Sequence, residues 1–159
     1  MSNKTLTFVR SVWDSFRATS GLEPRLLNNL QILTARPGNV TFSLPIEGHH
    51  TNRLKILHGG TIACMTDLGG SLAVASNELH ATGVTTDLNV TYLSSGGKVG
   101  DTILAEAICD KIGKNLAFTE VRFKDEKTGE LVARGSHTKF VRRAWEEKEK
   151  NNNNNKGVS

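Results

Sequence analysis

Residues 61–79 are the part of the sequence that most limits how this chain can fold. They contain no proline, and apolar residues recur there at the spacing of one helical face, at Ile62, Met65, Leu72 and Leu79. This is the one long and mostly apolar helix that the sequence predicts. Such a helix has to be covered by other elements. We therefore expect a fold built around a single central helix.

Strand patterns fill most of the remaining chain. Residues 30–36 and 40–46 flank a Pro-Gly-Asn turn, and the strict alternation of apolar and polar residues in the second segment predicts a β-hairpin. Four more strands are predicted, at about residues 83–94, 99–112, 115–126 and 130–141. Their short loops indicate an antiparallel meander. Five or six such strands and one apolar helix predict an α+β fold in which the sheet wraps around the helix.

The two ends of the chain differ from this body. Apolar residues at helical spacing in residues 4–18 predict an amphipathic helix, so residues 1–28 are interpreted as an N-terminal helix and its connector. Residues 29–142 are expected to form one domain, because a chain of 159 residues suffices for only one. Residues 143–159 are strongly polar and include five consecutive asparagines, which predicts a disordered tail.

Charge and hydropathy narrow the possible partners. The formal net charge of +4 favours anionic partners, but the basic residues are scattered and form no stripe interleaved with aromatic residues. We therefore predict a phosphate-bearing small ligand and no nucleic acid. No apolar run approaches the roughly 20 residues that span a bilayer, so no integral membrane association is expected.

The cysteines and the N-terminus bear on the compartment. Cys64 and Cys109 lie far apart and match no metal-ligand or redox spacing, which favours a reducing, cytoplasmic environment. Residues 1–13 contain two basic residues, several hydroxyl residues and no acid, as mitochondrial presequences do. A mitochondrial location is therefore the alternative, although an amphipathic first helix accounts for the same residues.

Three segments carry a resemblance to a known family. Residues 52–60 read NRLKILHGG, Asp67 follows seven positions after the last of these glycines, and residues 83–92 read GVTTDLNVTY. Together they resemble the small acyl-CoA thioesterases of the hotdog superfamily, especially the acyl-CoA thioesterase 13 group and the related bacterial phenylacetic-acid-pathway thioesterases. The likeness covers roughly residues 30–140.

The resemblance implies a hotdog fold and hydrolysis of acyl-CoA thioesters to free CoA and a carboxylic acid. The acyl group would be a medium- or long-chain fatty acyl or an aryl-acyl group. No cofactor is expected, because coenzyme A is part of the substrate. The family also commonly forms homodimers that pair into homotetramers.

Asp67 is the only carboxylate inside the apolar helix, and a buried acid needs a reason to be there. General-base catalysis is one such reason, because partial burial would raise the pKa of the carboxyl group toward a value suited to taking a proton from water. Attack on the thioester by the carboxylate itself is a second possibility. A salt-bridged acid on an exposed helix face is the structural alternative.

Gly59 and Gly60 are expected to begin the helix, where backbone N–H groups lack intrahelical acceptors and favour developing negative charge. The resemblance assigns polarisation of the thioester carbonyl to the N–H of Gly59 and to the side chain of Asn52. Glycines that merely turn the chain are the alternative.

The spacing of Gly59 and Asp67 bears on assembly. Eight residues of helix separate them by about 12 Å, too far for both to contact one carbonyl group. Two protomers with antiparallel helices would bring Asp67 of one toward Gly59 of the other, and the small residues Gly69 and Gly70 would permit that approach. The sequence thus predicts an active site shared across a dimer.

Thr85, His58 and the adjacent histidines His49 and His50 are further candidate site residues. Thr85 stands where relatives tend to have a serine that holds the attacking water, and a plain strand threonine is the alternative. His58 could donate to a backbone or substrate oxygen, or be purely structural, and we do not predict it to be the base. The adjacent His49 and His50 lack a third ligand at a familiar spacing, so no metal site is predicted.

The resemblance places coenzyme binding in two turns rich in glycine and lysine, which suit phosphates but also occur in ordinary hairpins. The residues concerned are Tyr92, Leu93, Ser94, Ser95, Gly96, Gly97, Lys111, Ile112, Gly113, Lys114, Asn115 and Leu116, with Asp87 and Phe140 nearby.

Two other functions are the alternatives to thioester hydrolysis. A hotdog enoyl-thioester hydratase would need an Asp/His pair over the α and β carbons of the substrate, and His58 does not sit like that pair. A non-catalytic acyl-CoA sensor would keep the pocket without the chemistry, but the sequence retains Asp67, Asn52 and both glycines.

Overall fold

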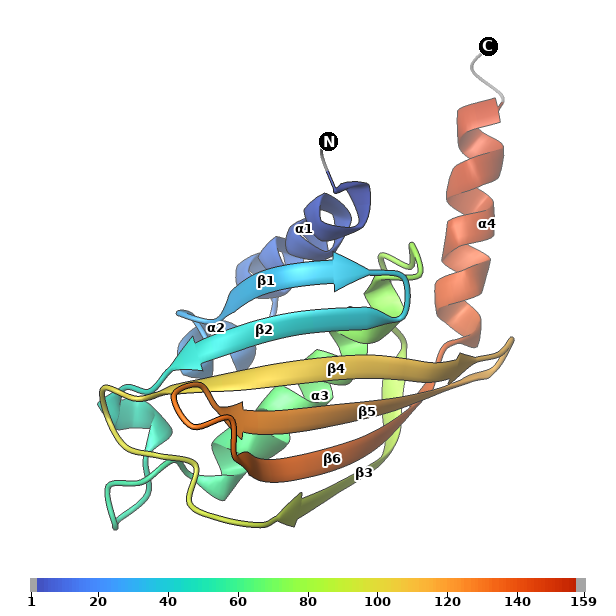
Figure 1. Ribbon diagram of the computed structural model, residues 1–159. Coiled ribbons are helices and arrows are strands. Elements are labelled where there is room, and N and C mark those ends of the chain that lie inside the picture. Colours follow the sequence, from blue (N-terminus) through green and yellow to red (C-terminus); the bar gives the residue numbers. More distant parts are fainter. Residues whose placement is uncertain (1–2, 157–159) are drawn as a thin grey trace.

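The apolar stretch forms helix α3, Gly59–Ala75, and a six-stranded antiparallel sheet curves around it (Figure 1). The structure is a computed structural model and describes residues 3–156. Helices α1 (Lys4–Thr19) and α2 (Glu23–Leu26) precede strands β1 (Gln31–Arg36) and β2 (Asn39–Pro45), and the short 3-10 helix η1 (Gly48–His50) leads to α3. Strands β3 (Val84–Tyr92), β4 (Thr102–Ile112), β5 (Leu116–Asp125) and β6 (Leu131–Phe140) follow, and helix α4 (Arg142–Lys156) comes last.

The order of the strands corrects the predicted meander. The sheet runs β1-β2-β4-β5-β6-β3, so β3 pairs with β6 at one edge and not with β4, its neighbour in sequence. Residues 93–101 carry the chain from that edge to β4 in the middle of the sheet. β4 alternates buried and partly exposed residues, as a central strand should, whereas β3 is exposed along most of its length. β3 therefore leaves one row of backbone groups unpaired at the sheet edge.

Helix α3 packs closely on the inner face of the sheet through its small residues. A Cβ atom on Gly69 would come within 3.1 Å of the Phe42 ring, and one on Gly70 within 2.5 Å of Thr119 Oγ1. The predicted close approach at these glycines is therefore confirmed, but it is made by the chain's own sheet. The expectation that they admit a partner helix was wrong.

The central helix ends earlier than the apolar stretch does. The chain leaves the helical path at Ser76, and Glu78 takes a left-handed φ of 63°. Leu79, which the pattern assigned to the helix, lies beyond its end but is still buried, in a small cluster with Val74 and Val141.

Helix α1 has the predicted amphipathic character. Val9, Val12 and Trp13 are buried, and the helix packs against β1 and α3. Among residues 3–156, none of the helices has the length and apolar character needed to cross a membrane.

The prediction of a disordered tail was wrong for residues 143–156, which belong to helix α4 (Figure 1), while residues 157–159 of that tail lie outside the described residues. The helix is anchored at its start, where Ala144 is buried and Trp145 Nε1 donates to the Gly113 carbonyl at 3.1 Å. An i,i+4 pair between Arg142 and Glu146, with 3.2 Å between Nε and Oε1, supports the first turns. Polarity alone suggested disorder, but a few anchored apolar residues suffice to order a helix whose remainder is exposed.

Candidate active site

His58 is the N-cap residue, which immediately precedes α3. Its side-chain Nδ1 accepts a hydrogen bond from the N–H of Gly60 at 2.7 Å and so caps the helix. This contact uses one of the first N–H groups of the helix. The N–H of Gly59 belongs to the same first turn, which has no intrahelical acceptor for it. His58 thus has a structural role here, and the geometry favours Gly59 over Gly60 as a donor to a substrate.

Asn52 lies in a tight turn just before α3. Its side-chain oxygen accepts from the N–H of Leu54 at 2.9 Å and from that of Ile56 at 3.4 Å. Because the oxygen is held by the backbone, the amide N–H₂ group is the part of the side chain that can donate elsewhere. Asn52 and His58 line the same shallow surface hollow. The structure therefore brings these two predicted residues together at the start of the helix.

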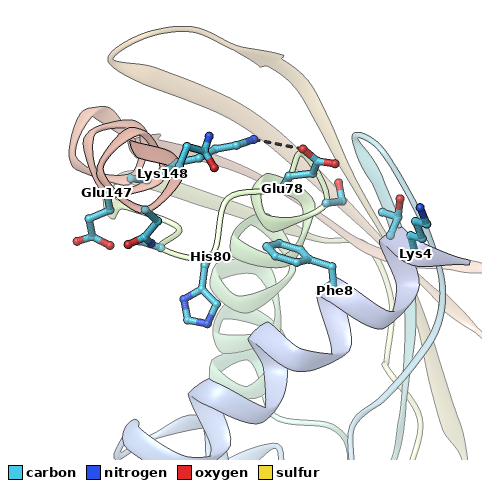
Figure 2. A pocket seen from close by; sticks show the side chains of 12 residues that line it. Lys4, Phe8, Glu78, His80, Glu147 and Lys148 are labelled. Atoms are coloured by element: carbon cyan, nitrogen blue, oxygen red, sulfur yellow. Dashed lines mark hydrogen bonds and ion pairs between the residues drawn. The ribbon is translucent and has the colours of Figure 1, made fainter. Parts of the chain in front are cut away.

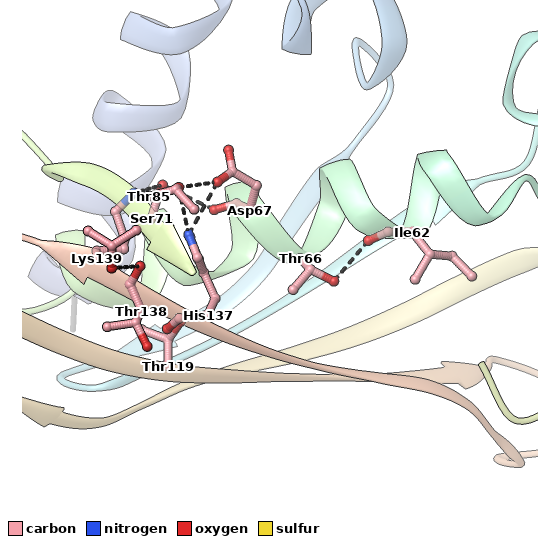
Figure 3. Close-up of polar contacts among 10 residues, drawn as sticks. Ile62, Thr66, Asp67, Ser71, Thr85, Thr119, His137, Thr138 and Lys139 are labelled. Carbon is pink, nitrogen blue, oxygen red and sulfur yellow. Dashed lines mark hydrogen bonds and ion pairs between the residues drawn. The ribbon is translucent and has the colours of Figure 1, made fainter. Parts of the chain in front are cut away.

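Asp67 lies two turns further along α3 in a cluster of polar side chains (Figure 3). Thr85 Oγ1 on β3 donates to Asp67 Oδ1 at 2.5 Å, and His137 Nε2 on β6 lies 3.2 Å from the same oxygen. The side chain of Asp67 is 42% exposed, while that of His137 is fully buried. One carboxylate oxygen is thus held by the protein, and the other points away from these two partners (Figure 3).

The predicted rise in the pKa of Asp67 was wrong. The hydrogen bond from His137 is the main reason that the pKa of Asp67 falls from 3.8 to about 2, and the hydrogen bond from Thr85 and the charge of Lys139 act in the same direction. Burial raises the pKa but is outweighed. The structural alternative, a salt-bridged acid on an exposed face, also fails to describe Asp67, because the carboxylate is held by side chains from two strands, β3 and β6.

His137 was missed by the sequence analysis. Its Nε2 lies 2.8 Å from Thr85 Oγ1, and its Nδ1 is buried without a hydrogen-bond partner among the described residues. A proton on Nε2 fits this setting, because a proton on Nδ1 would be a buried donor without an acceptor. His137 thus donates toward the oxygens of Thr85 and Asp67.

Period-two alternation along β6 is the signal that could have found His137. Residues Gly135, His137 and Lys139 are all buried, whereas Ser136 between them is exposed and Thr138 is half-buried. Two ionisable residues on the inner face of a strand are unusual. That pattern marks β6 as a strand that contributes to a polar site.

The first predicted coenzyme segment, residues 92–97, lies beside the start of α3. Tyr92 Oη donates to the Gly59 carbonyl at 2.7 Å, and the Gly97 carbonyl accepts from the N–H of Leu57 at 2.8 Å. Tyr92 is half exposed, and Leu93, Ser94 and Ser95 are also exposed, while Gly96 is buried against Leu57.

The second segment, residues 111–116, lies at the opposite end of the sheet beside α4 (Figure 1). It forms the tip of the β4–β5 hairpin, and Phe140 on β6 pairs there with Leu116. Asp87 is exposed on β3, opposite Thr138. Within one protomer the two segments are therefore not brought together.

A separate hollow lies between α1, the segment after α3, and α4 (Figure 2). Phe8 and His80 line it, and an ion pair of 3.4 Å between Glu78 and Lys148 crosses one side. None of the predicted site residues lines this hollow. Within residues 3–156 no three His, Cys, Asp or Glu side chains gather as metal ligands would.

Comparison with known proteins gives the family. Residues 54–132 match the model of the family described as the thioesterase superfamily. A Schizosaccharomyces pombe protein described as an esterase is 51% identical over 89% of this chain and 87% of its own length. Human acyl-coenzyme A thioesterase 13 is 40% identical over 74% of this chain and 83% of its own.

Solved structures agree with the sequence comparison. Zebrafish thioesterase superfamily member 2 has a TM-score of 0.79 and 35% identity, covering 86% of this chain and 97% of its own. A thioesterase protein from Streptococcus pneumoniae, solved with coenzyme A, has a TM-score of 0.68 and 25% identity, covering 74% of this chain and 88% of its own. The fold is therefore the predicted hotdog fold, and the chain belongs to the thioesterase superfamily of thioester hydrolases.

Proposed function

We propose that this enzyme hydrolyses acyl-CoA thioesters to free CoA and a carboxylic acid. The observation that carries the proposal is the Asp67 carboxylate, which is ionised, fixed through Oδ1 by Thr85 and His137, and open through its other oxygen. The human relative named acyl-coenzyme A thioesterase 13 and the pneumococcal structure with coenzyme A support the choice of thioester. Medium- or long-chain fatty acyl and aryl-acyl groups are the proposed acyl parts.

The start of α3 supplies the electrophilic half of the reaction. The N–H of Gly59 and the amide of Asn52 donate to the thioester oxygen and stabilise the negative charge that develops there. A glycine suits this position because no side chain stands between the N–H and the substrate. His58 keeps the helix start in place by capping Gly60.

Asp67 supplies the nucleophilic half. As a base it takes a proton from water while the water oxygen attacks the carbonyl carbon, the carbon–sulfur bond breaks, and the CoA thiolate then takes a proton. As a nucleophile it attacks the same carbon directly, the carbon–sulfur bond breaks and the CoA thiolate leaves and takes a proton, and water then hydrolyses the resulting anhydride to the carboxylic acid and free Asp67. Both routes start from the charged carboxylate, which its low pKa ensures at neutral pH. Thr85 holds the carboxylate in place for either route.

A homodimer brings the two halves together. Gly59 and Asp67 lie on one helix about 12 Å apart, so they cannot serve the same carbonyl within one protomer. The exposed edge strand β3 carries Thr85 and offers unpaired backbone groups to a second copy. In this arrangement Asp67 and Thr85 of one protomer face Gly59 and Asn52 of the other. A dimer of such dimers is the proposed full assembly.

The same arrangement explains the separation of the coenzyme segments. Residues 92–97 accompany the Gly59 half, and residues 111–116 with Phe140 lie at the other end of the sheet, so a dimer can offer both to one coenzyme. The backbone of the turns and the amine of Lys114 suit its phosphates. We propose no cofactor beyond the coenzyme A carried by the substrate.

The other functions fit less well. In a hydratase the histidine of an Asp/His pair has to reach the acyl chain, whereas the ring of His137 is buried beneath Asp67. A non-catalytic sensor would not need a carboxylate fixed by two partners and left open on one side.

The test is release of free thiol from a series of acyl-CoA substrates by wild type and by Asp67→Asn. We expect turnover by the wild type and a loss of roughly 10²–10⁴-fold in the variant, with coenzyme binding kept. Undiminished turnover in the variant would remove Asp67 from the mechanism. Binding without turnover in the wild type would favour the sensor, and hydration of an enoyl-CoA would favour the hydratase.

A further inference from the structure

Lys139 is a lysine buried behind the Asp67 cluster. Only 3% of its surface is exposed, although lysine is rarely buried without a paired charge. It lies on β6 opposite Thr85 on β3, with its side chain on the inner face of the sheet. Its Nζ donates to Ser71 Oγ at 3.0 Å (Figure 3). Lys139 thus reaches α3 one turn after Asp67.

Ser71 links this lysine to the acid. While Ser71 Oγ accepts from Lys139, it donates to the backbone carbonyl of Asp67 at 3.1 Å. Burial lowers the pKa of Lys139, and the charge of Asp67 acts against that effect. The two charges therefore interact through the protein interior, and the hydrogen-bonded chain fixes the ammonium group of Lys139 against the backbone of Asp67.

Fold stability does not account for Lys139. An ammonium group has three donors, and taking it out of water for a contact with one hydroxyl is unfavourable. An apolar side chain of similar length commonly serves a buried position at least as well. A buried charge next to a site is therefore better explained by what it does for the site.

We propose that Lys139 is a positioning residue that keeps Asp67 ionised when substrate covers the acid. The inference rests on the proposed function. Asp67 is half exposed in the protomer, and a bound acyl-CoA displaces water that stabilises its charge. A cation already fixed inside the protein does not move on binding, and its attraction strengthens as water leaves.

The groups around Asp67 on the neighbouring elements do not supply a fixed positive charge in place of Lys139. On α3, Cys64 stays a neutral thiol, because burial, Glu23 of α2 and Asp67 raise its pKa to about 12. The polar side chains that β3 and β5 bring to the cluster, Thr85 and Thr119, carry no charge. His137 acts on Asp67 mainly through its hydrogen bond. Among the charges that lower the pKa of Asp67, that of Lys139 has the larger effect and that of His137 the smaller.

The experiment compares Lys139→Met with Lys124→Met, which removes a lysine from β5 outside the cluster. The acid limb of the kcat profile of Lys139→Met should move up by about one pH unit, so that turnover falls about tenfold on the acid side and recovers as the pH rises. KM should hardly change. The carbon-13 titration of the Asp67 carboxyl should shift upward as well. The control should match wild type in all three.

Thermal unfolding separates this role from a structural one. Lys139→Met should unfold at the wild-type temperature or above it, because a buried charge has been removed. A variant that fails to fold would overturn the inference, as would an unshifted acid limb or titration. Ser71→Ala, which removes the link but keeps the charge, should give a smaller shift in the same direction. Absence of CoA release by the wild type would overturn only the proposed function, since the titration needs no turnover.

Discussion

The start and the middle of α3 both present polar groups, but they are built in different ways. At the start, Asn52 and His58 are held by backbone groups within a few residues of themselves, and they lie at the surface. In the middle, Asp67 is held by Thr85, 18 residues away, and by His137 from the far strand β6. The first region positions donors, and the second fixes a charge. A thioesterase needs both, which is why two copies of the helix are proposed to meet.

The strongest test of the division between the start and the middle of α3 is to inactivate each of them in a different protomer. Asn52→Ala and Asp67→Ala should each lose roughly 10²-fold or more in turnover. If sites are shared, subunit exchange between the variants restores one intact site in each mixed dimer, and about a quarter of wild-type activity returns. The measurement is thiol release after exchange, with exchange proven by differently tagged protomers. No recovery would place both residues in one protomer's site.

Substitution of Thr85 tests whether the cluster around Asp67, in the middle of α3, needs the hydroxyl group of Thr85. Thr85→Val keeps the shape of the side chain but removes the donor to Asp67, so turnover should fall about 10- to 100-fold, as expected for a hydrogen bond to a charged group. Thr85→Ser keeps the donor and serves as the matched control, with activity near that of wild type. Equal activity of the valine and serine variants would show that the hydroxyl is not needed.

Substitution of Gly70 tests the close packing of α3 on Thr119 and His137 of the sheet, next to Asp67. A Cβ at this position would lie 2.5 Å from Thr119 Oγ1 and would also meet the ring of His137. Gly70→Ala should therefore lower the free energy of unfolding by about 1–3 kcal/mol. Gly21→Ala, where nothing lies within 4 Å of the added atom, is the control and should change it by less than about 0.5 kcal/mol. Urea unfolding of both variants measures the difference.

The smallest expected effect is the pH dependence that Asp67 gives to stability. Its pKa is near 3.8 unfolded and about 2 folded, so its ionisation stabilises the fold fully above the unfolded value. This contribution is lost as the pH falls toward the folded value. Urea unfolding of wild type and Asp67→Asn from about pH 5 to about pH 2 should show their stabilities converging. A constant difference would contradict the lowered pKa of Asp67.

Much of the fold follows from pattern. The apolar helix, the hairpin and the strands are local signals, and the structure has all of them with small shifts of boundary. The place of β3 at the sheet edge could not be predicted from such local signals. Short loops predict pairing between strands that are consecutive in sequence, but the longer connection between β3 and β4 does not show which strand β3 pairs with. The helix α4 was missed because composition does not reveal that Ala144 and Trp145 find partners on the body.

The candidate site likewise has one part that could be predicted from local sequence and one part that could not. The sequence by itself determined the start of α3, where His58, Gly59 and Gly60 are consecutive and a helix must leave its first N–H groups open. Only the tertiary structure decided the state of Asp67. Its surroundings in sequence are apolar and suggest a raised pKa, but folding brings Thr85, His137 and Lys139 to it from β3 and β6 and lowers the pKa instead. Burial can be anticipated from a helical pattern, whereas hydrogen bonds and charges from distant strands exist only once the sheet has closed around the helix.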